Sequence, residues 1–463
     1  MNTFDSNGEA ISLNPATGKT FARYPYQTSA DLEQSLARVQ KAFEHWRDVD
    51  VRDRATLLIK LAGVLRLRAE PMAQMAVEEM GKPIAQARAE IEKCAAMCDW
   101  YAANGPQMLD PEPTSVENDK AYIAYRPLGA VLAVMPWNFP IWQALRGAVP
   151  IILAGNPYVL KHAPNVMGCA YLLRDVFAES GFAPGVFEVL NITPAGVSAA
   201  IQDTRIASVA VTGSVRAGSA IAAQAGAALK KCVLELGGSD AFIVLADADL
   251  DEAVKAATVG RFQNSGQICV AAKRIIVEQS IAAAFEDKFV AAVSALKVGD
   301  PLQDTTYIGP MARYDLRDEL DGQVQATLAQ GARLVMGGHK VPGEGNFYAP
   351  TVLADVTPGM TAFVEETFGP VASLIVARDA EHAIELANDS EFGLAGSLWT
   401  ADVDKARQLA ARMVTGAVFI NGYTASDPRV PIGGVKKSGF GRELSHYGVR
   451  EFCNAQTIWI DRR

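Results

Sequence analysis

Cysteine is scarce in this sequence, with six in 463 residues and no C-x-x-C pair. Six cysteines are too few for a disulfide framework in a chain of this length. The first 15 residues also lack a basic segment followed by an apolar run, which is the pattern of a secretory signal. We therefore expect a cytoplasmic protein in which a cysteine thiol is free to act as a nucleophile.

Little in the sequence favours a membrane, a nucleic acid or a metal ion as a partner. The longest charge-free apolar stretch, residues 127–145, contains Pro136, Asn138 and Pro140, which suits a strand, turn and helix better than a membrane span. The 43 basic residues are outnumbered by 52 acidic ones, and a net charge of −9 gives no overall field that attracts nucleic acid. The five histidines are scattered without H-x-x-x-H spacing, so we expect no metal site.

The composition is that of an ordinary globular protein, and the helices come first. Apolar residues make up 49% and charged residues 21%, and the length allows about three domain-sized units. Apolar side chains recur at helical spacing from Leu32 to Trp46, after the start signal Thr28-Ser-Ala-Asp31. Two more helices are predicted over residues 54–68 and 90–101, and a Pro- and Glu-rich segment over 110–117 breaks this helical pattern.

Short apolar runs, separated by helix-compatible segments, then predict two parallel sheets. The first set of strands is expected at residues 130–134, 158–160, 187–190, 207–211 and 232–236. The second set is expected at residues 241–245, 274–277, 334–336 and 418–421. We infer two α/β domains without internal repeats or a long linker.

Two residues stand out as candidates for nucleophile and base. Cys269 follows a polar segment with Gly266 three residues before it, which indicates an exposed turn; the alternative is a buried cysteine beside Ile268 and Val270. Glu235 lies in an apolar strand immediately before two glycines, where burial would raise its pKa and suit it to act as a general base. An ordinary salt-bridged glutamate at a strand end is the alternative.

Two further motifs lie between a predicted strand and the helix that follows it. In Pro136-Trp-Asn-Phe-Pro140 the amide of Asn138 could donate to an oxyanion, or the residue could simply cap the next helix. Gly213-Ser-Val-Arg-Ala-Gly218 is a strand-to-helix turn whose free N–H groups could bind phosphate. Its spacing is neither G-x-G-x-x-G nor that of a P-loop, so a packing role for the glycines is an open alternative.

These motifs occur together and in an order that resembles the aldehyde dehydrogenase superfamily. The resemblance runs from Asn14-Pro-Ala-Thr-Gly18 to Gly433-Gly-Val-Lys-Lys-Ser-Gly-Phe-Gly-Arg-Glu443 and so covers nearly the whole chain. The motifs between these ends are Pro136-Trp-Asn-Phe-Pro140, Thr212-Gly-Ser214, Glu235-Leu-Gly-Gly238, Gly266-Gln-Ile-Cys269 and Glu366-Thr-Phe-Gly-Pro370. Residues 161–169 and 425–429 look most similar to the bacterial NAD(P)-dependent succinate-semialdehyde dehydrogenases.

The resemblance implies an oxidation of an aldehyde to a carboxylic acid with NAD or NADP. Cys269 would attack the aldehyde carbon as a thiolate. The Asn138 amide and the backbone N–H of Cys269 would stabilise the tetrahedral oxyanion. Hydride transfer would leave a thioester, and Glu235 would activate the water that hydrolyses it.

The resemblance also implies where the cofactor binds. Lys161 would bind the adenosine ribose, Glu366 would hold the nicotinamide ribose, and Phe368 would line the nicotinamide ring. The remaining cofactor contacts are expected from Pro136, Trp137, Ala163, Gly213, Ser214, Gly218 and Leu236. Many NAD-preferring members carry a glutamate three residues after the lysine; here that position is Pro164, so we expect NADP to be accepted beside NAD.

The substrate that the resemblance favours is succinate semialdehyde, and its carboxylate needs a cation near the pocket, preferably an arginine. We expect Arg146, eight residues after Asn138, to bind that carboxylate from the helix that should wall the substrate tunnel, with Trp142 nearby on the same helix. Arg429, in a late loop, is the second candidate.

The implied fold is α/β, with a Rossmann-type cofactor domain over residues 1–117 and 130–237 and an α/β catalytic domain over 238–446. A small β oligomerisation element would comprise residues 118–129 and 447–463, and the partly alternating tail 456–461 is typical of an edge strand. The expected assembly is a homodimer or homotetramer.

Three alternative functions remain open. The enzyme could oxidise another small aldehyde, such as glutarate semialdehyde or an aliphatic aldehyde. It could be a CoA-acylating aldehyde dehydrogenase, although the presence of Glu235 argues against this. It could also be a non-catalytic binding protein on the same fold, but that would normally leave Cys269 or Glu235 replaced, and both are present.

Overall fold

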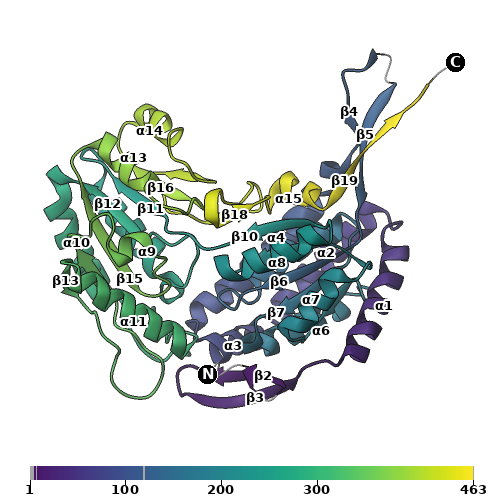
Figure 1. The fold of residues 1–463 in the computed structure, drawn as a ribbon, viewed down its shortest axis with the longest axis horizontal. Coiled ribbons are helices and arrows are strands. Elements are labelled where there is room, and N and C mark those ends of the chain that lie inside the picture. The colour runs from purple at the N-terminus through teal and green to yellow at the C-terminus, as the bar shows by residue number, and fades with distance from the viewer. Residues whose placement is uncertain (1–4, 7, 118–119, 462–463) are drawn as a thin grey trace.

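The computed structural model describes residues 5–6, 8–117 and 120–461, and these residues form two large and two small β-sheets. Figure 1 shows the two large sheets in separate halves of the molecule, with a narrow arm projecting from one half. The expected oligomerisation element begins at residues 118–119 and ends at 462–463, and these four residues lie outside the described part of the chain. No helix of the described residues is long and apolar enough to cross a membrane.

Helices dominate the first hundred residues as predicted, but an antiparallel sheet precedes them. Strands β1 (Asp5–Ser6), β2 (Glu9–Asn14) and β3 (Lys19–Pro25) form it, so the helical prediction was wrong for this segment. Helix α1 (Ser29–Trp46) begins at the predicted signal because Thr28 and Asp31 form a capping box. The helices that follow are α2 (Val51–Leu67), α3 (Ala69–Met80) and α4 (Ile84–Asn104).

The first predicted set of strands forms a parallel sheet in the order β10-β9-β6-β7-β8, which confirms that prediction. The strands are β6 (Ala130–Met135), β7 (Tyr158–His162), β8 (Phe187–Val189), β9 (Ile206–Thr212) and β10 (Lys231–Glu235). Strand β18 (Gly439–Phe440) extends this sheet antiparallel to β10, although it comes from far later in the chain. The helices between the strands are α5 (Trp142–Leu153), α6 (Met167–Glu179), α7 (Pro194–Gln202) and α8 (Val215–Ala227).

The strand order reverses between β6 and β9. The chain runs from β6 to its neighbour β7 on one side, whereas β9 pairs with β6 on the other side. Ligands of open α/β sheets bind at the carboxyl ends of the strands where the order reverses in this way. The loops that leave this point begin at Pro136 and Gly213, which are the two strand-to-helix motifs of the sequence.

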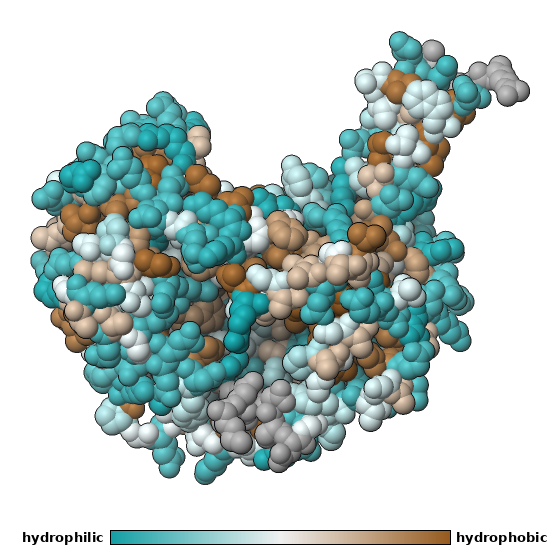
Figure 2. Space-filling view, viewed as in Figure 1, coloured by the Kyte–Doolittle hydropathy of each residue, from teal (hydrophilic) through white to brown (hydrophobic). Residues whose placement is uncertain are grey.

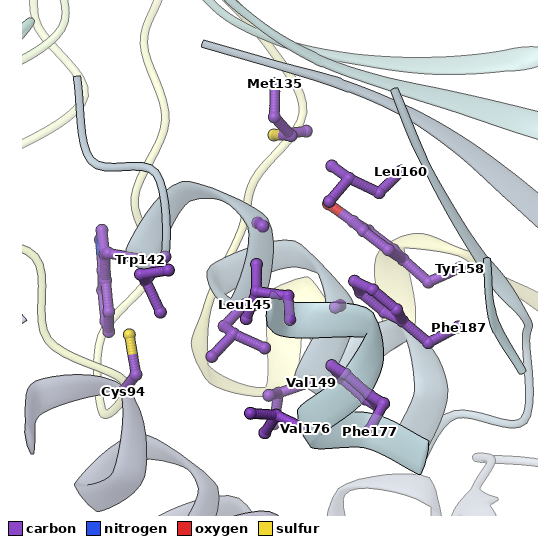
Figure 3. Packing of buried hydrophobic residues seen from close by; sticks show 14 of the residues in the cluster. Cys94, Met135, Trp142, Leu145, Val149, Tyr158, Leu160, Val176, Phe177 and Phe187 are labelled. Atoms are coloured by element: carbon purple, nitrogen blue, oxygen red, sulfur yellow. The ribbon is translucent and has the colours of Figure 1, made fainter. Parts of the chain in front are cut away.

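Helix α5 lies inside the protein, and all of its 12 residues are buried. Figure 3 shows Trp142 at its start beside Cys94 of α4. On the other side of the helix the ring of Phe187 stacks on those of Tyr158 and Phe177, with centroids 5.9 and 4.0 Å away. Because α5 follows the Pro136-to-Pro140 motif directly, this packing determines where the motif lies.

The second large sheet has the order β13-β14-β15-β12-β11-β16-β17 and is parallel except at β13. Its strands are β11 (Ala241–Val244), β12 (Arg274–Glu278), β13 (Arg333–Met336), β14 (Thr351–Ala354), β15 (Val371–Ala377), β16 (Gly396–Trp399) and β17 (Val418–Ile420). The prediction found four of these strands and missed β14, β15 and β16. The helices are α9 (Leu250–Phe262), α10 (Ala282–Ser294), α11 (Tyr314–Ala329), α12 (Thr361–Val364), α13 (Ala380–Asn388) and α14 (Val403–Ala410).

The projecting arm is a three-stranded antiparallel sheet. Strand β5 (Ala121–Pro127) lies in its centre, between β4 (Glu112–Pro113) and β19 (Cys453–Trp459). The tail is therefore an edge strand, as its alternation predicted. Residues 447–451 belong instead to helix α15 (Ser445–Glu451), so the first part of the expected β segment is helical. Apolar side chains interrupt the polar surface along the arm in Figure 2.

Candidate active site

A cavity of about 800 Å³ lies at the carboxyl ends of β6, β9 and β10, between the two halves of the protein. Its walls bring together motifs that are up to 230 residues apart in the sequence. The sequence-predicted residues that line it are Pro136, Trp137, Asn138, Gly213, Ser214, Glu235, Leu236, Cys269, Glu366 and Phe368. Among the described residues, no group of three or more His, Cys, Asp or Glu side chains is placed to hold a metal ion.

Cys269 is held at the cavity by a strained turn. The residues before it adopt left-handed backbone conformations, with φ of 54° at Asn264, 55° at Ser265 and 71° at Gly266. Such a conformation costs about 1–3 kcal/mol at a non-glycine residue, so surrounding contacts must support it. The Asn264 amide donates to the carbonyl of Asn138 at 2.8 Å, and the Ser265 hydroxyl donates to the carbonyl of Gly309 at 3.0 Å.

The thiol of Cys269 is half-buried, and burial raises its pKa to about 11, while the nearby cations Arg146 and Lys273 pull it down. The resting group at neutral pH is therefore the protonated thiol. The thiolate is the nucleophilic form, so a reaction at this sulfur needs a group that accepts the proton.

Asn138 lies beside the cysteine turn and is 4% exposed. Its side-chain N–H donates to the carbonyl of Gln267 at 2.9 Å. A primary amide has two N–H donors, so the second can serve an oxyanion that forms at Cys269. Helix α5 starts at Trp142 with Ile141 at its N-cap position, which excludes the alternative that Asn138 caps this helix.

Glu235 is the last residue of β10 and lies between Thr212 of β9 and Gly439 of β18. Its side chain is 4% exposed, and burial raises the pKa of its carboxyl above the usual range. Arg146 counteracts this shift from 4.0 Å, and Glu443 reinforces it. A buried carboxylate with a raised pKa can hold a proton near neutral pH, as a general base requires.

Arg146 was expected at the substrate carboxylate, and in the structure its guanidinium lies 4.0 Å from the carboxylate of Glu235. It is 2% exposed, forms an ion pair with Glu443, and donates to the Thr212 hydroxyl at 3.4 Å. The group is thus engaged by two buried carboxylates. Its position suits it to orient the carboxylate of Glu235. Glu443 falls inside the motif that ends the family resemblance, but nothing in the sequence pointed to an ion pair with Arg146.

Glu366 is positioned by Lys273, a residue that the sequence reasoning missed. The Nζ of Lys273 lies 3.0 Å from Glu366 Oε1 and donates to the carbonyl of Cys269 at 2.6 Å. The side chain of Lys273 is fully buried, and the backbone N–H of Gly238 also donates to Glu366. The sequence did contain a signal for this residue, since Lys273 follows an apolar run that leads into β12. A lysine buried there needs a partner for its ammonium.

The Pro136-to-Pro140 motif is held by helix α4 through a buried ion pair. Glu90 accepts hydrogen bonds from the backbone N–H groups of Ile141 and Trp142 at 2.9 and 2.8 Å. Its other oxygen pairs with Lys82, whose ammonium lies 3.7 Å from the centroid of the Phe139 ring. Neither Lys82 nor Glu90 was singled out from the sequence, because Lys82 lies in the short Gly-Lys-Pro turn between α3 and α4, Glu90 lies within α4, and a charged residue is common at either kind of position.

The cofactor side of the cavity fits a dinucleotide. Its volume lies within the range of small-molecule sites. Ser214 is the N-cap of the 13-residue helix α8, and a helix N-terminus at this point of a sheet favours a phosphate. A Cβ on Gly213 would meet no atom within 4 Å, whereas one on Gly218 would fall 2.4 Å from Leu236, so the first glycine is open to the cavity and the second is a packing residue. The Trp137 and Phe368 rings meet edge to face, with centroids 5.8 Å apart.

The remaining expected site residues lie outside this lining. Lys161 is half-buried near the carboxyl end of β7, and the half-buried Ala163 follows that strand. Trp142 is 3% exposed, and its ring contacts Lys93 of α4. The side chain of Arg429 is 71% exposed and forms an ion pair with Asp427 at 2.7 Å.

The sequence and the fold of the chain are similar to those of known proteins. The model of the aldehyde dehydrogenase family matches residues 4–458. The chain is 63% identical over 453 residues to the NAD(P)+ succinate semialdehyde dehydrogenase Sad of Escherichia coli strain K12, covering 98% of each chain. It is 46% identical to an NADP+ succinate-semialdehyde dehydrogenase of Mycobacterium bovis, covering 97% of this chain and 99% of the relative. It also superposes on the crystal structure of the Streptococcus pyogenes succinic semialdehyde dehydrogenase with NADP+, with a TM-score of 0.95 and 35% identity, over 98% of this chain and 100% of that one.

Proposed function

The chain belongs to the aldehyde dehydrogenase family, and from this premise we propose that it oxidises succinate semialdehyde to succinate with NAD or NADP. The observation that carries the proposal is the meeting of Cys269, Asn138 and Glu235 at one cavity beside a glycine turn and helix N-terminus. The relatives named above support the choice of substrate and of cofactors.

The first step makes the nucleophile. The thiol of Cys269 loses its proton, which we assign to the carboxylate of Glu235 on the same cavity wall. The sulfur then forms a bond to the aldehyde carbon, and the carbonyl oxygen takes up the electron pair of the C=O bond. The second amide N–H of Asn138 and the backbone N–H of Cys269 stabilise this oxyanion.

The oxidation leaves a thioester on Cys269. NAD or NADP, when bound, supplies the acceptor for the hydride that leaves the thiohemiacetal carbon. Glu366 would hold the nicotinamide ribose, and Trp137 and Phe368 would line the ring. Gly213 and the N-terminus of α8 would take the pyrophosphate, and Lys161 would take the adenosine ribose.

Hydrolysis completes the reaction. Once Glu235 has released the thiol proton to solvent, its carboxylate accepts a proton from water, and the hydroxide attacks the thioester carbon. The carbon–sulfur bond breaks, the sulfur of Cys269 is the leaving group and is left as a thiolate, and the acid is released. Because water is the acyl acceptor, this route needs no CoA.

The decisive experiment measures reduced cofactor and acid product with purified protein. We expect NADH and NADPH formation with succinate semialdehyde, and succinate in equal amount without CoA. Glutarate semialdehyde and butanal, each with both cofactors, are the competing substrates, and the Cys269→Ala variant is the control for site-specific turnover. A strict need for CoA, or a higher kcat/KM for another aldehyde, would contradict the proposal.

The same proposal extends to assembly and location. Strand β19 lies at one edge of the arm's sheet. Trp459 at the end of this strand is 59% exposed, and Ile460, which follows it, is 42% exposed. An edge strand with exposed apolar side chains supports pairing of the arm with a second copy in a homodimer or homotetramer. All six cysteines are free, which supports the expected cytoplasmic location. Analytical ultracentrifugation of the protein and of a variant with Trp459→Lys tests the first point; a monomeric starting protein would contradict it.

A further inference from the structure

One face of helix α4 is directed at the catalytic region. The amide of Gln86 accepts a hydrogen bond from the backbone N–H of Asn264 in the cysteine turn, at 2.8 Å. One turn later Glu90 holds the start of α5. Lys93 comes next on the same face, because positions i, i+4 and i+7 align along a helix.

Lys93 lies between α5 and the late loop. Its Nζ is 4.1 Å from the centroid of the Trp142 ring and donates to the Ser426 hydroxyl at 2.9 Å. Figure 3 shows the neighbouring residue Cys94 directly beside the Trp142 ring, so this part of α4 packs against the first turn of α5. The next residue of α5, Gln143, lines the active-site cavity.

This ammonium has no carboxylate of its own. Among the described residues, the two carboxylates whose charges act to raise its pKa are Glu90 and Asp427, while Arg146 acts to lower it. Each of these carboxylates has another cation, since Glu90 pairs with Lys82 and Asp427 pairs with Arg429. Lys93 is half-buried, and burial lowers its pKa to about 8. A cation that loses hydration without gaining a counterion is stabilised by a bound anion.

The two arginines expected to bind the substrate are less suitable. Arg146 is engaged by Glu443 and Glu235, and Arg429 is exposed and neutralised by Asp427. Ser426 adds a second donor beside Lys93, because a hydroxyl that accepts the lysine N–H keeps its own O–H for donation.

We propose that Lys93, assisted by the Ser426 hydroxyl, binds the carboxylate of the substrate beside the active-site cavity, behind the start of α5. The proposal rests on the assigned oxidation of a carboxylated aldehyde and names the residue that selects it. The matching ligand is a short aldehyde with a carboxylate at its far end.

The test compares succinate semialdehyde with butanal, which has the same four-carbon chain but no carboxylate. We expect Lys93→Met to lower kcat/KM for succinate semialdehyde by roughly 10- to 100-fold, mostly through KM, because charge-assisted hydrogen bonds are lost. Activity on butanal should change by less than about threefold, which also shows that the variant folds. Lys93→Arg should recover most of the lost activity, and Ser426→Ala should show a smaller loss in the same direction.

An exposed lysine outside the cavity lining provides the matched control. Lys255→Met removes a charge whose side chain is 75% exposed and should leave both substrates unaffected. Equal losses on both aldehydes in Lys93→Met, or an unchanged KM for succinate semialdehyde, would overturn the role of Lys93. A wild-type protein that oxidises butanal but not succinate semialdehyde would instead overturn the proposed function, so the two failures are distinguishable.

Discussion

The Nζ of Lys273 lies 3.0 Å from Glu366 Oε1 and 2.6 Å from the carbonyl oxygen of Cys269. One buried ammonium thus connects the turn that carries Cys269, the proposed nucleophile, to the glutamate that would hold the nicotinamide ribose. Glu366 and Cys269 are almost 100 residues apart in sequence, so this lysine fixes the position of the expected cofactor-binding glutamate relative to the cysteine.

Replacing Lys273 should therefore weaken cofactor binding and catalysis together. We expect Lys273→Met to raise the KM for NAD and to lower kcat/KM by roughly 10- to 100-fold, because a charge-assisted hydrogen bond to Glu366 is lost. Steady-state kinetics with varied NAD measures this. Binding of NAD to the variant with unchanged affinity would show that Glu366 does not depend on Lys273.

The reactivity of Cys269 should depend steeply on pH. Its pKa is raised to about 11 by burial, so below that value the thiolate fraction increases about tenfold for each pH unit. We expect the rate constant for alkylation by iodoacetamide, without cofactor, to increase in this proportion from pH 7 to pH 9. Peptide mass spectrometry assigns the modified residue, and Cys269→Ala is the control. A rate that levels off below pH 8 would show that the thiol is already ionised.

Glu235→Gln keeps the size of the side chain and removes the base. We expect kcat to fall by about 10²- to 10⁴-fold, the range of general-base catalysis, because neither the thiol nor the attacking water can transfer its proton. The melting temperature should not fall, since the variant removes a carboxylate whose buried charge is unfavourable. A kcat within threefold of the wild type would exclude Glu235 as the base.

The cofactor preference should follow from Pro164, which begins a short 3₁₀ turn after β7. A carboxylate at this position would repel the 2′-phosphate of NADP, by roughly 4 kcal/mol for charges about 4 Å apart at an effective dielectric near 20. We expect the wild type to discriminate between NAD and NADP by less than a thousandfold in kcat/KM. Pro164→Glu should lower kcat/KM for NADP at least tenfold while leaving that for NAD within threefold; equal effects on both cofactors would contradict this.

The ion pair of Lys82 and Glu90 should stabilise the loop that carries Asn138. Glu90→Gln leaves a fully buried ammonium without a counterion, and breaking a buried pair in this way costs about 3–5 kcal/mol. We expect a large decrease in melting temperature, and a lower kcat in the protein that remains folded. The double variant Lys82→Met/Glu90→Gln should recover part of the stability. Thermal unfolding of the wild type, both single variants and the double variant measures the coupling, and strictly additive losses would mean that the pair does not act as a unit.

Much of the local structure could be predicted from the sequence. The Thr28 capping box, the five parallel strands of the first sheet and the strand-to-helix position of the Pro136-to-Pro140 motif all depend on neighbouring residues in the chain. Strands β14, β15 and β16 were missed. The four residues of β14 and of β16 and six of the seven residues of β15 are buried, so these strands show no regular alternation between apolar and polar residues.

The candidate nucleophile and the candidate base could also be recognised from the sequence. A cysteine after a polar glycine turn and a glutamate inside an apolar strand are unusual whatever surrounds them, and both line the cavity. The partners of these residues were not recognisable. Lys273, Glu443 and Glu90 look like common charged residues until their burial and their contacts are known.

Arg146 shows most clearly why sequence and fold contribute different information. The position of this residue on the helix after Asn138 follows from a spacing of eight residues, and the structure places it on α5. The partner of its charge is Glu443. This residue lies near Arg146 because β18, slightly more than 200 residues after β10, pairs with that strand. The order of motifs along the chain therefore specifies the reactive groups, since their chemistry is local. The packing of distant segments specifies which charges face the substrate, since a buried ion takes its partner from whatever the fold brings within reach.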